Sequence, residues 1–410
     1  MTESRSTRIL FSRRSVLGML GTAGVVAAVP GCGSSLGGGG DAGGGGQGGA
    51  VKVGLVIPQA GVYAPLGVDM QRGWELYLNQ HDGRLGDREV TTVVADEGEG
   101  PESGVPAVQR VLQRDRVDVV VGIVNSAVAL GAVDAVTSAG KLLVVSNAGA
   151  GALTGENRNP LTWRTSFANA QVSSALGDHL AGQNLPGGVY LIAPDYAAGE
   201  EALGGFREAF EAGGGRIAGE ARTPFGTTQD FQPFLAGIRS SGAAATFCFY
   251  AGGEAVSFVQ QYDSFGLKQT IPLFGSGFLT EGGVLDAQGA AATGVQTSLH
   301  YTTELDNPAN TAFIDSYTAA NGAAPTVYSV QTYDAAAVLD RAIGQAGDVA
   351  GTALSEAMGS LGTIEDSPRG PWTFDGQNPR QTYYLREVRR QGQGYVNAVV
   401  ADLGEFAQPA

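Results

Sequence analysis

VDVVVGIVNSAVALGAVDAV, residues 117–136, joins two different patterns at one polar junction. Its first part is a run of apolar, mostly β-branched residues ending at Gly122, which is typical of a strand buried on both faces. From Ala127 onward the apolar residues follow a helical spacing. Asn125 and Ser126 lie between the two patterns, so we expect them at the N-cap of a helix that follows directly on a buried strand.

The same alternation of strand and helix extends in both directions from this stretch. Short apolar runs separated by helical segments predict a parallel sheet covered on both faces. The predicted strands are 51–58, 89–96, 117–122, 141–146, 187–194, 215–222, 244–251 and 271–276. The predicted helices between them are 69–80, 102–115, 127–139, 170–183, 198–212, 230–240 and 254–265. An interruption at 160–168 divides the series into two arrays, which predicts an α/β protein with two Rossmann-like lobes.

The C-terminal part of the chain has a different pattern. Residues 308–320, 328–346 and 352–360 have helical spacing. The stretch 370–403 alternates polar and apolar residues and is broken by Gly-Gln-Asn-Pro and Gln-Gly-Gln-Gly, which are turn sequences. This segment therefore predicts short antiparallel strands joined in hairpins.

The composition favours a globular protein and argues against some partners. The chain has 410 residues, of which 43% are hydrophobic and 16% charged, enough for two domains with a real core. A net charge of −15 without a basic stripe argues against nucleic acid as a partner. The two cysteines, Cys32 and Cys248, have no metal-site spacing, and we expect Cys248 to pack as a small buried hydrophobe. We expect a monomer without metal or cofactor.

The N-terminus has the features of an export signal, predicted over 1–32. Residues 12–17 resemble a twin-arginine signal, and an apolar stretch from Val16 to Val29 follows. Val29-Pro30-Gly31-Cys32 resembles a bacterial lipobox, in which the cysteine is lipidated. The glycine-rich segment 33–50 predicts a flexible tether. Together they predict a lipoprotein on the outer face of the cytoplasmic membrane; an uncleaved anchor helix is the alternative.

In an open α/β sheet, ligands bind beyond the carboxyl ends of the strands, where helix N-termini expose unpaired N–H groups. Asn125 and Ser126 lie at such a position. The Ser126 hydroxyl could cap its own helix, as serine at this position usually does. It could also point outward and, with the helix N–H groups, bind a small anion such as a carboxylate.

Several segments resemble, in the same order, the branched-chain amino acid-type substrate-binding proteins of ABC transporters, which have the type I periplasmic binding fold. The resemblance extends over about 51–404. The segments that carry it are VGLVIPQAGVYAPLGVDMQRGWELYLNQ (53–80), VVGIVNSAVAL (120–130), VVSNAGAGALTG (144–155), APDYAAGEEALGGFREAFEAGGG (193–215), YSVQTYDAAAVLDRAI (328–343) and the tail from 369 to 395.

The resemblance implies two lobes joined by three crossings, with one small ligand held between them by hinge closure. It places lobe one at 51–166 plus 299–368 and lobe two at 167–298 plus 369–404. The crossings are expected near Arg164, Tyr301 and Gly370. The implied partners are a small amino acid or related carboxylate and an ABC permease.

By the same resemblance, Ser126 binds the ligand carboxylate with backbone N–H groups of the loop 147–150. Tyr196 approaches from lobe two, although it could instead be an aromatic that packs the lobes. Tyr63 lines the cleft mouth or is a surface tyrosine. The predicted ligand-binding residues are Ser126, Asn125, Asn147, Ala148, Gly149, Ala150, Tyr196, Tyr63, Gly277 and Glu281.

The sequence departs from amino-acid binders of this family at two positions. Ala150 or Gly149 replaces the threonine of the second loop. Gly277 replaces the lobe-two carboxylate that pairs with the ligand's α-ammonium, and Glu281 follows four residues later. A buried ammonium without an anion would cost several kcal/mol. Either Glu281 or Glu254 reaches the ammonium, or the ligand has no α-amine.

Other classes of function have less support in the sequence. The three histidines, His81, His179 and His300, belong to no nucleophile or metal motif, and no G-x-S-x-G is present, so we expect no enzyme. A ligand sensor that signals to a membrane receptor or kinase has the same requirements as an import protein and remains the alternative.

Overall fold

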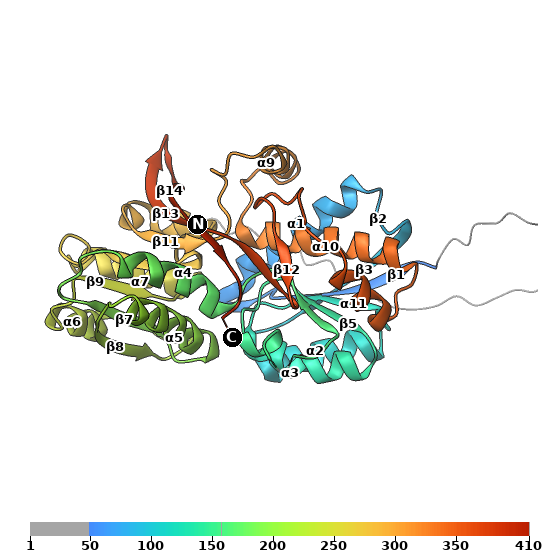
Figure 1. Ribbon diagram of the computed structural model, residues 1–410, viewed down its shortest axis with the longest axis horizontal. Helices are drawn as coiled ribbons and strands as arrows, with labels where there is room; N and C mark the ends of the chain where they lie inside the picture. Colours follow the sequence, from blue (N-terminus) through green and yellow to red (C-terminus); the bar gives the residue numbers. More distant parts are fainter. Residues whose placement is uncertain (1–48, 157, 410) are drawn as a thin grey trace, which may run out of the picture. The chain divides into compact units, whose positions relative to one another are not determined.

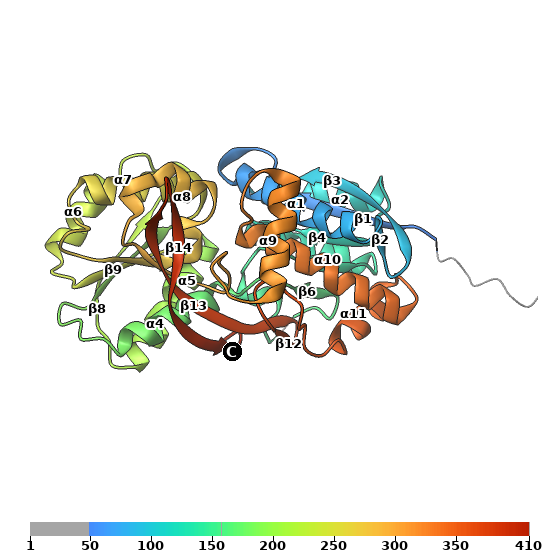
Figure 2. The same ribbon diagram turned by 90° about the horizontal axis from the view of Figure 1, so that it is seen from above.

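The computed structural model describes residues 49–156 and 158–409, which form two α/β lobes (Figures 1 and 2). Each lobe has its own sheet, and the chain passes between the two sheets three times: after β6, after β11 and before β12. The predicted export signal 1–32, its Cys32 and the tether up to residue 48 lie outside the described residues.

Lobe one contains a six-stranded sheet in the order β2-β3-β1-β4-β5-β6. Its strands are parallel except for the short edge strand β2. They are β1 (Val51–Ile57), β2 (Arg84–Leu85), β3 (Arg88–Asp96), β4 (Val119–Gly122), β5 (Leu142–Val145) and β6 (Thr162–Arg164). The helices are α1 (Ala64–Gln80), α2 (Pro101–Gln113), α3 (Ser126–Ser138), α9 (Pro308–Asn321), α10 (Val327–Ala346) and α11 (Gly351–Gly359).

Alternate side chains of the lobe-one strands pack against different helices. Val53 and Val121 belong to the same apolar core as residues of α1, α10 and α11. Val56 and Val120 belong to a separate core with residues of α2 and α3. Figure 1 shows these two groups of helices on opposite faces of the sheet. The near-continuous apolar strands follow from this burial on both faces.

Lobe two contains an eight-stranded sheet in the order β12-β13-β11-β10-β9-β7-β8, with β14 paired to β13. Its parallel strands are β7 (Val189–Pro194), β8 (Ile217–Thr223), β9 (Ala245–Cys248), β10 (Leu273–Ser276) and β11 (Gln296–Leu299). The antiparallel strands are β12 (Thr373–Asp375), β13 (Asn378–Gln391) and β14 (Gly394–Phe406). The helices are α4 (Asn169–Ala181), α5 (Ala197–Ala212), α6 (Gln232–Ser240), α7 (Gly252–Ser264) and α8 (Gly283–Gln288).

The predicted α/β architecture is confirmed, and most predicted elements differ from the observed ones only at their ends. The antiparallel tail appears as β12, β13 and β14. The first helix begins at Ala64 instead of 69, because Pro65 stands in its first turn, where proline is favoured. The interruption at 160–168 contains the unpredicted strand β6, whose three residues pair with β5. Cys248 is fully buried, as predicted.

Buried polar side chains join the segments where the chain crosses between the lobes. Arg369 and Asp334 are both about 1% exposed, and Arg369 Nε lies 3.0 Å from Asp334 Oδ2. Arg369 Nη1 also donates to Gln381 Oε1 at 2.6 Å. Burial raises the pKa of Asp334 to about 6 although Arg369 and Ser367 lower it. This cluster ties α10 of lobe one to β13 of lobe two.

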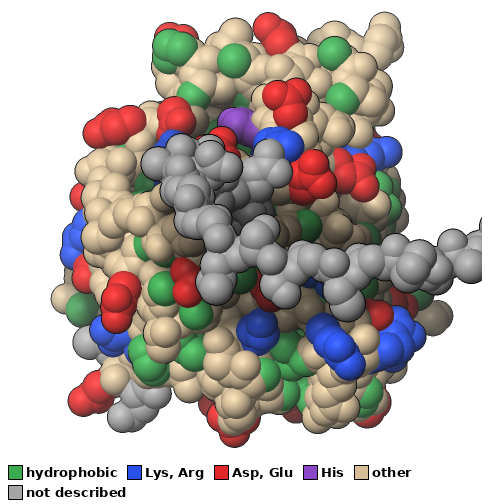
Figure 3. Space-filling view, turned by 90° about the vertical axis from the view of Figure 1, so that its right-hand side faces the viewer, with side chains coloured by type: hydrophobic (Ala, Val, Ile, Leu, Met, Phe, Trp, Pro, Cys, Tyr) green, Lys and Arg blue, Asp and Glu red, His purple; other side chains and the backbone are tan. Residues whose placement is uncertain are grey.

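Charges of both signs are interspersed on the surface drawn in Figure 3. The helices of the described part of the chain include none that is long and apolar enough to cross a membrane. Within the same residues, no group of three or more His, Cys, Asp or Glu side chains is arranged to hold a metal ion.

Candidate ligand-binding site

A cavity lies between the lobes, where strands of both sheets end. Asn125 and Ser126 follow β4, Tyr196 follows β7, and Phe249 follows β9. The cavity has a volume of about 30 Å³, enough for about two water molecules. Its lining consists of Tyr63, Leu66, Val124, Asn125, Ser126, Asn147, Gly149, Phe167, Asn169, Tyr196, Ala198, Phe249, Ala251, Phe278 and Tyr328.

Asn125, and not Ser126, is the N-cap of α3. The Oδ1 atom of Asn125 accepts hydrogen bonds from the N–H groups of Ala127 at 2.9 Å and Val128 at 3.4 Å. Its Nδ2 donates to the backbone oxygen of Glu99 at 3.0 Å. The capping role considered for Ser126 is therefore corrected, because the preceding residue already performs it. The Ser126 hydroxyl has no hydrogen-bond partner among the described residues.

A buried carboxylate lies behind this junction. Glu97 is fully buried, and its two oxygens accept the N–H groups of Val124 at 2.8 Å and Asn125 at 2.6 Å. Burial raises the pKa of Glu97 to about 8, although the two backbone hydrogen bonds lower it. Glu97 thus accepts the N–H groups of Val124 and Asn125. The N–H group of Ser126 is the next one along the chain and is not bonded to Glu97.

Only part of the loop 147–150 faces the cavity. Asn147 and Gly149 line it, whereas Ala148 and Ala150 pack in the core beneath α3. Asn147 Nδ2 donates to Gln331 Oε1 at 2.9 Å, which fixes the orientation of the amide. A Cβ atom on Gly149 would lie 2.3 Å from Asn169 Oδ1, so glycine allows this loop to approach lobe two closely.

Six aromatic rings form much of the cavity wall. The rings of Phe167 and Phe278 lie 4.6 Å apart, and Phe278 lies 6.2 Å from both Phe249 and Tyr328. Tyr328 is 2% exposed, and its hydroxyl has no hydrogen-bond partner among the described residues. The remaining rings are those of Tyr63 and Tyr196. The wall of the cavity on this side is therefore aromatic and largely apolar.

Tyr63 and Tyr196 meet across the lobe boundary. Their hydroxyl oxygens lie 3.5 Å apart, and Tyr196 stacks on Phe225 at 4.3 Å. Burial raises the pKa of both tyrosines above the ordinary value, so both remain neutral at physiological pH. The structure therefore places Tyr63 inside the boundary between the lobes, at 7% exposure, and not on the outer surface.

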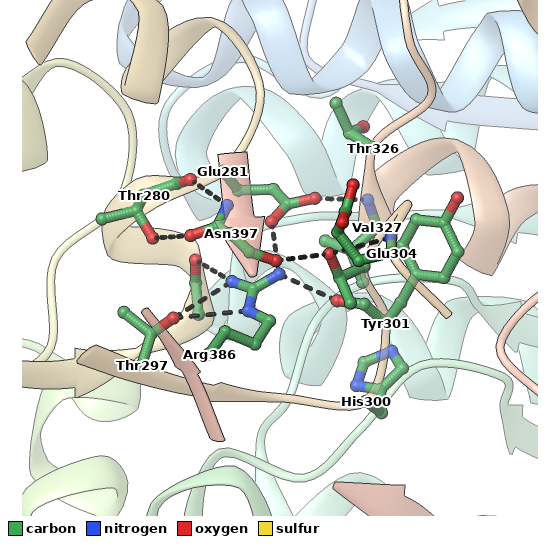
Figure 4. Close-up of polar contacts among 12 residues, drawn as sticks. Thr280, Glu281, Thr297, His300, Tyr301, Glu304, Thr326, Val327, Arg386 and Asn397 are labelled. Carbon is green, nitrogen blue, oxygen red and sulfur yellow. Dashed lines mark hydrogen bonds and ion pairs between the residues drawn. The ribbon is translucent and has the colours of Figure 1, made fainter. Parts of the chain in front are cut away.

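Gly277 and Glu281 do not line this cavity. A Cβ atom on Gly277 would meet Leu299 and Arg386, so the residue faces the interior of lobe two. Glu281 Oε2 lies 2.9 Å from Arg386 Nη1, and Glu281 Oε1 accepts the N–H group of Val327 at 2.8 Å (Figure 4). Both oxygens of Glu281 are thus already bonded within the protein.

Two α/β lobes with a cavity between opposed strand ends are the architecture of solute-binding proteins. A family model for periplasmic binding proteins matches residues 50–393, and the chain belongs to this family. Members of this family are non-enzymatic, and their location is extracytoplasmic.

Individual relatives agree with this assignment. Leu/Ile/Val-binding protein homolog 6 of Brucella melitensis is 29% identical over 368 residues, which cover 88% of this chain and 93% of the relative. A solute-binding protein of an ABC transporter from R. palustris, solved with benzoate, is 37% identical with a TM-score of 0.80 and covers 87% of this chain and 98% of its own. A substrate-binding protein of an ABC transporter from Sphaerobacter thermophilus is 32% identical with a TM-score of 0.81. The match covers 88% of this chain and 99% of that protein.

Most of the aromatic part of the cavity lining could not be recognised from the sequence. Tyr63 and Tyr196 were predicted as site residues, whereas Phe167, Phe249, Phe278 and Tyr328 were not. An apolar ring directly after a strand looks like a core residue, because which way it faces depends on the opposing lobe. The available signal was position: Phe249 follows β9 and Phe278 follows β10 at the carboxyl edge of the sheet.

Proposed function

We propose that this chain is the solute-binding component of an ABC importer and that its ligand is an aromatic carboxylate of the benzoate class. The observation that carries the proposal is the cavity lining, in which the described residues contribute six aromatic rings and no charged side chain. An amino acid would bury its α-ammonium there without an anionic partner, at a cost of several kcal/mol. An aromatic acid has no such group.

The polar end of the cavity suits a carboxylate. The Ser126 hydroxyl and the N–H groups of Ser126 and Gly149 have no acceptor among the described residues. Hydrogen bonds from such donors to a carboxylate are charge-assisted and stronger than neutral ones. The partial positive charge at the N-terminus of α3 adds to this attraction. The ligand therefore needs no lysine or arginine as counter-ion.

The relatives support an aromatic ligand. The R. palustris protein solved with benzoate is 37% identical to this chain. Proteins solved with 3,4-dihydroxy benzoic acid and with 4-hydroxybenzoate are 29% and 26% identical, with TM-scores of 0.81 and 0.82. The isoleucine complex of a Streptococcus pneumoniae protein is only 20% identical, and that likeness concerns the fold alone.

Ligand entry requires the lobes to separate. A cavity of about 30 Å³ is smaller than a benzoate ion, and Tyr63 and Tyr196 close it from opposite lobes. We infer that the three crossings act as a hinge and that closure brings the aromatic rings of both lobes against the ligand. A closed form of this kind is what the permease of an importer would receive.

The N-terminal sequence supports delivery at a membrane. Arg13 and Arg14, the apolar stretch that follows and Cys32 indicate export and lipidation, and the glycine-rich tether would let the protein reach a permease beside its anchor. We therefore propose that the chain is a lipoprotein on the outer face of the cytoplasmic membrane.

Calorimetric titration with benzoate, 4-hydroxybenzoate and L-leucine tests the proposed ligand class. We expect both aromatic acids to bind and leucine not to bind. Ser126→Ala should weaken benzoate binding by about 10-fold to 100-fold, the effect of losing a hydrogen bond to a charged group. Ser240→Ala, at an exposed position on α6, is the matched control and should change nothing. Binding of leucine in preference to both acids would contradict the proposal.

A further inference from the structure

Two carboxylates of lobe two accept backbone N–H groups of lobe one. Glu201, on α5, accepts the N–H group of Gly151 at 3.1 Å and 3.0 Å through its two oxygens. Glu281, which precedes α8, accepts the N–H group of Val327 at 2.8 Å. Each of these hydrogen bonds crosses the boundary that has to open when the ligand enters.

Both donors begin a helical segment of lobe one. Gly151 is the first residue of the 3-10 helix Gly151–Leu153, and Val327 is the first residue of α10. The N–H group at such a position has no partner within its own helix. At the N-terminus of α10, a carboxylate also interacts favourably with the partial positive charge of the helix dipole. Lobe one thus presents two donors that lobe two satisfies only when the lobes are in contact.

Each carboxylate is oriented by a partner in its own lobe. Asn169 Nδ2 donates to Glu201 at 2.9 Å. Arg386, which is fully buried, binds Glu281 at 2.9 Å and also donates to the backbone oxygens of Tyr301 at 2.8 Å and Gly277 at 3.0 Å (Figure 4). These partners hold the two acceptors in place whether or not the lobe-one donors are present.

The two contacts lie next to different parts of the cavity wall. Val327 precedes Tyr328, and Phe278 lies three residues before Glu281; both of these rings line the cavity. On the other side, Gly151 lies two residues after the cavity residue Gly149. Close approach is built into this boundary, because a Cβ atom on Gly282 would lie 2.6 Å from Thr326 Cγ2.

We propose that Glu201 and Glu281 are positioning residues that together hold the two lobes closed. Their hydrogen bonds to lobe one lie on different sides of the cavity. Both sets form when the lobes close and break when the lobes open. The proposal requires two lobes that open and close, and it does not depend on the ligand being aromatic. It gives Glu281 a role in closure in place of contact with the ligand.

Amide hydrogen exchange at Gly151 and Val327 tests this coupling without a ligand. Exchange of these protons reports how often the lobes separate. Glu201→Ala should speed exchange at Val327, which Glu201 does not contact, by about tenfold, as well as at Gly151. Glu281→Gln should speed exchange at Gly151 in the same way. Glu200→Ala, an exposed neighbour on α5, is the control and should affect neither.

The proposal would be overturned by a purely local effect. In that case Glu201→Ala would speed amide exchange at Gly151 and leave exchange at Val327 unchanged. If Glu281→Gln fails to fold because Arg386 loses its partner, the Glu201→Ala result still decides. In a second arm, benzoate should dissociate about tenfold faster from Glu201→Ala than from the wild type, with an unchanged association rate. Failure of benzoate to bind the wild type would count against the proposed ligand. The exchange result would still show whether Glu201 and Glu281 together hold the lobes closed.

Discussion

Two regions of the same lobe boundary have opposite chemistry. The candidate ligand cavity is lined by aromatic, aliphatic and uncharged polar residues. A larger groove of about 510 Å³ lies at another part of the boundary and is lined by charged residues, including Asp69, Arg72, Glu281, Asp286 and Arg386. The difference indicates where this protein tolerates buried charge. The buried charges of the groove, Glu281 and Arg386, pair with each other inside the protein, whereas the described residues that line the cavity carry no charge.

The largest expected effect comes from unbalancing the charged region. Arg386→Met leaves the carboxylate of Glu281 buried without its cation, which should lower the free energy of unfolding by about 3–5 kcal/mol. The double variant Glu281→Met/Arg386→Met removes both charges and should recover most of that loss. Urea denaturation of the three proteins measures it. A double variant no more stable than Arg386→Met would show that charge balance is not what holds this region.

The next effect comes from placing a charge in the uncharged region. Phe278→Glu and Phe278→Gln introduce side chains of the same size that differ only in charge. A Glu carboxylate at this aromatic end of the cavity would lie about 8 Å from the ligand's own carboxylate and repel it by about 2 kcal/mol at an effective dielectric constant of about 20, so benzoate should bind the Glu variant about 30-fold more weakly than the Gln variant. Calorimetry on both variants measures the ratio. Equal affinities would mean that Phe278 does not lie near the bound carboxylate or that the site is solvated.

The most gradual expected effect concerns Glu97, a buried carboxyl beside the cavity that has no ion-pair partner among the described residues. Its folded-state pKa of about 8 lies above its ordinary value of 4.5, so the folded protein retains a proton that the unfolded chain releases. Its stabilising contribution is complete below about pH 4.5 and is lost as the pH rises through 8. The free energy of unfolding should therefore fall by up to about 1.4 kcal/mol per pH unit across that window.

Denaturation of the wild type and Glu97→Gln at several pH values between 5 and 8 isolates this term. The slope should be flatter in the variant, because glutamine does not titrate, while Asp334 contributes equally to both proteins. Parallel slopes would show that Glu97 stays ionised throughout the window.

Much of the fold follows from local patterns in the sequence. Apolar strands alternating with helices predicted both arrays, and turn residues predicted the antiparallel tail. The strand β6 was not predicted because it has only three residues and one of them is an arginine. Arg164 is fully buried, and its guanidinium is satisfied by hydrogen bonds to residues such as Asn378. No local pattern reports partners that are so distant in the chain.

Residues of the cavity lining were predictable where they directly follow a strand, as Tyr196 does in lobe two, and not where their orientation depends on the opposing lobe. Asn125, Ser126, Asn147 and Gly149 follow strands of lobe one, and the structure places all four in the cavity lining. The orientation of Glu281 depends on Arg386, 105 residues away in the sequence. The packing of the two lobes likewise determines which rings face the cavity. Local patterns in the sequence carry no information about this packing. The binding roles of these residues remain predictions.

The most direct test compares phenylacetate with L-phenylglycine, two acids that differ only by an α-ammonium group. Both carry the ring and the carboxylate, so the ratio of their dissociation constants measures how the cavity responds to the positive charge. We expect phenylacetate to bind at least about 100-fold more tightly, because the described residues that line the cavity include no anion to pair with the ammonium. Equal binding, or tighter binding of phenylglycine, would contradict it.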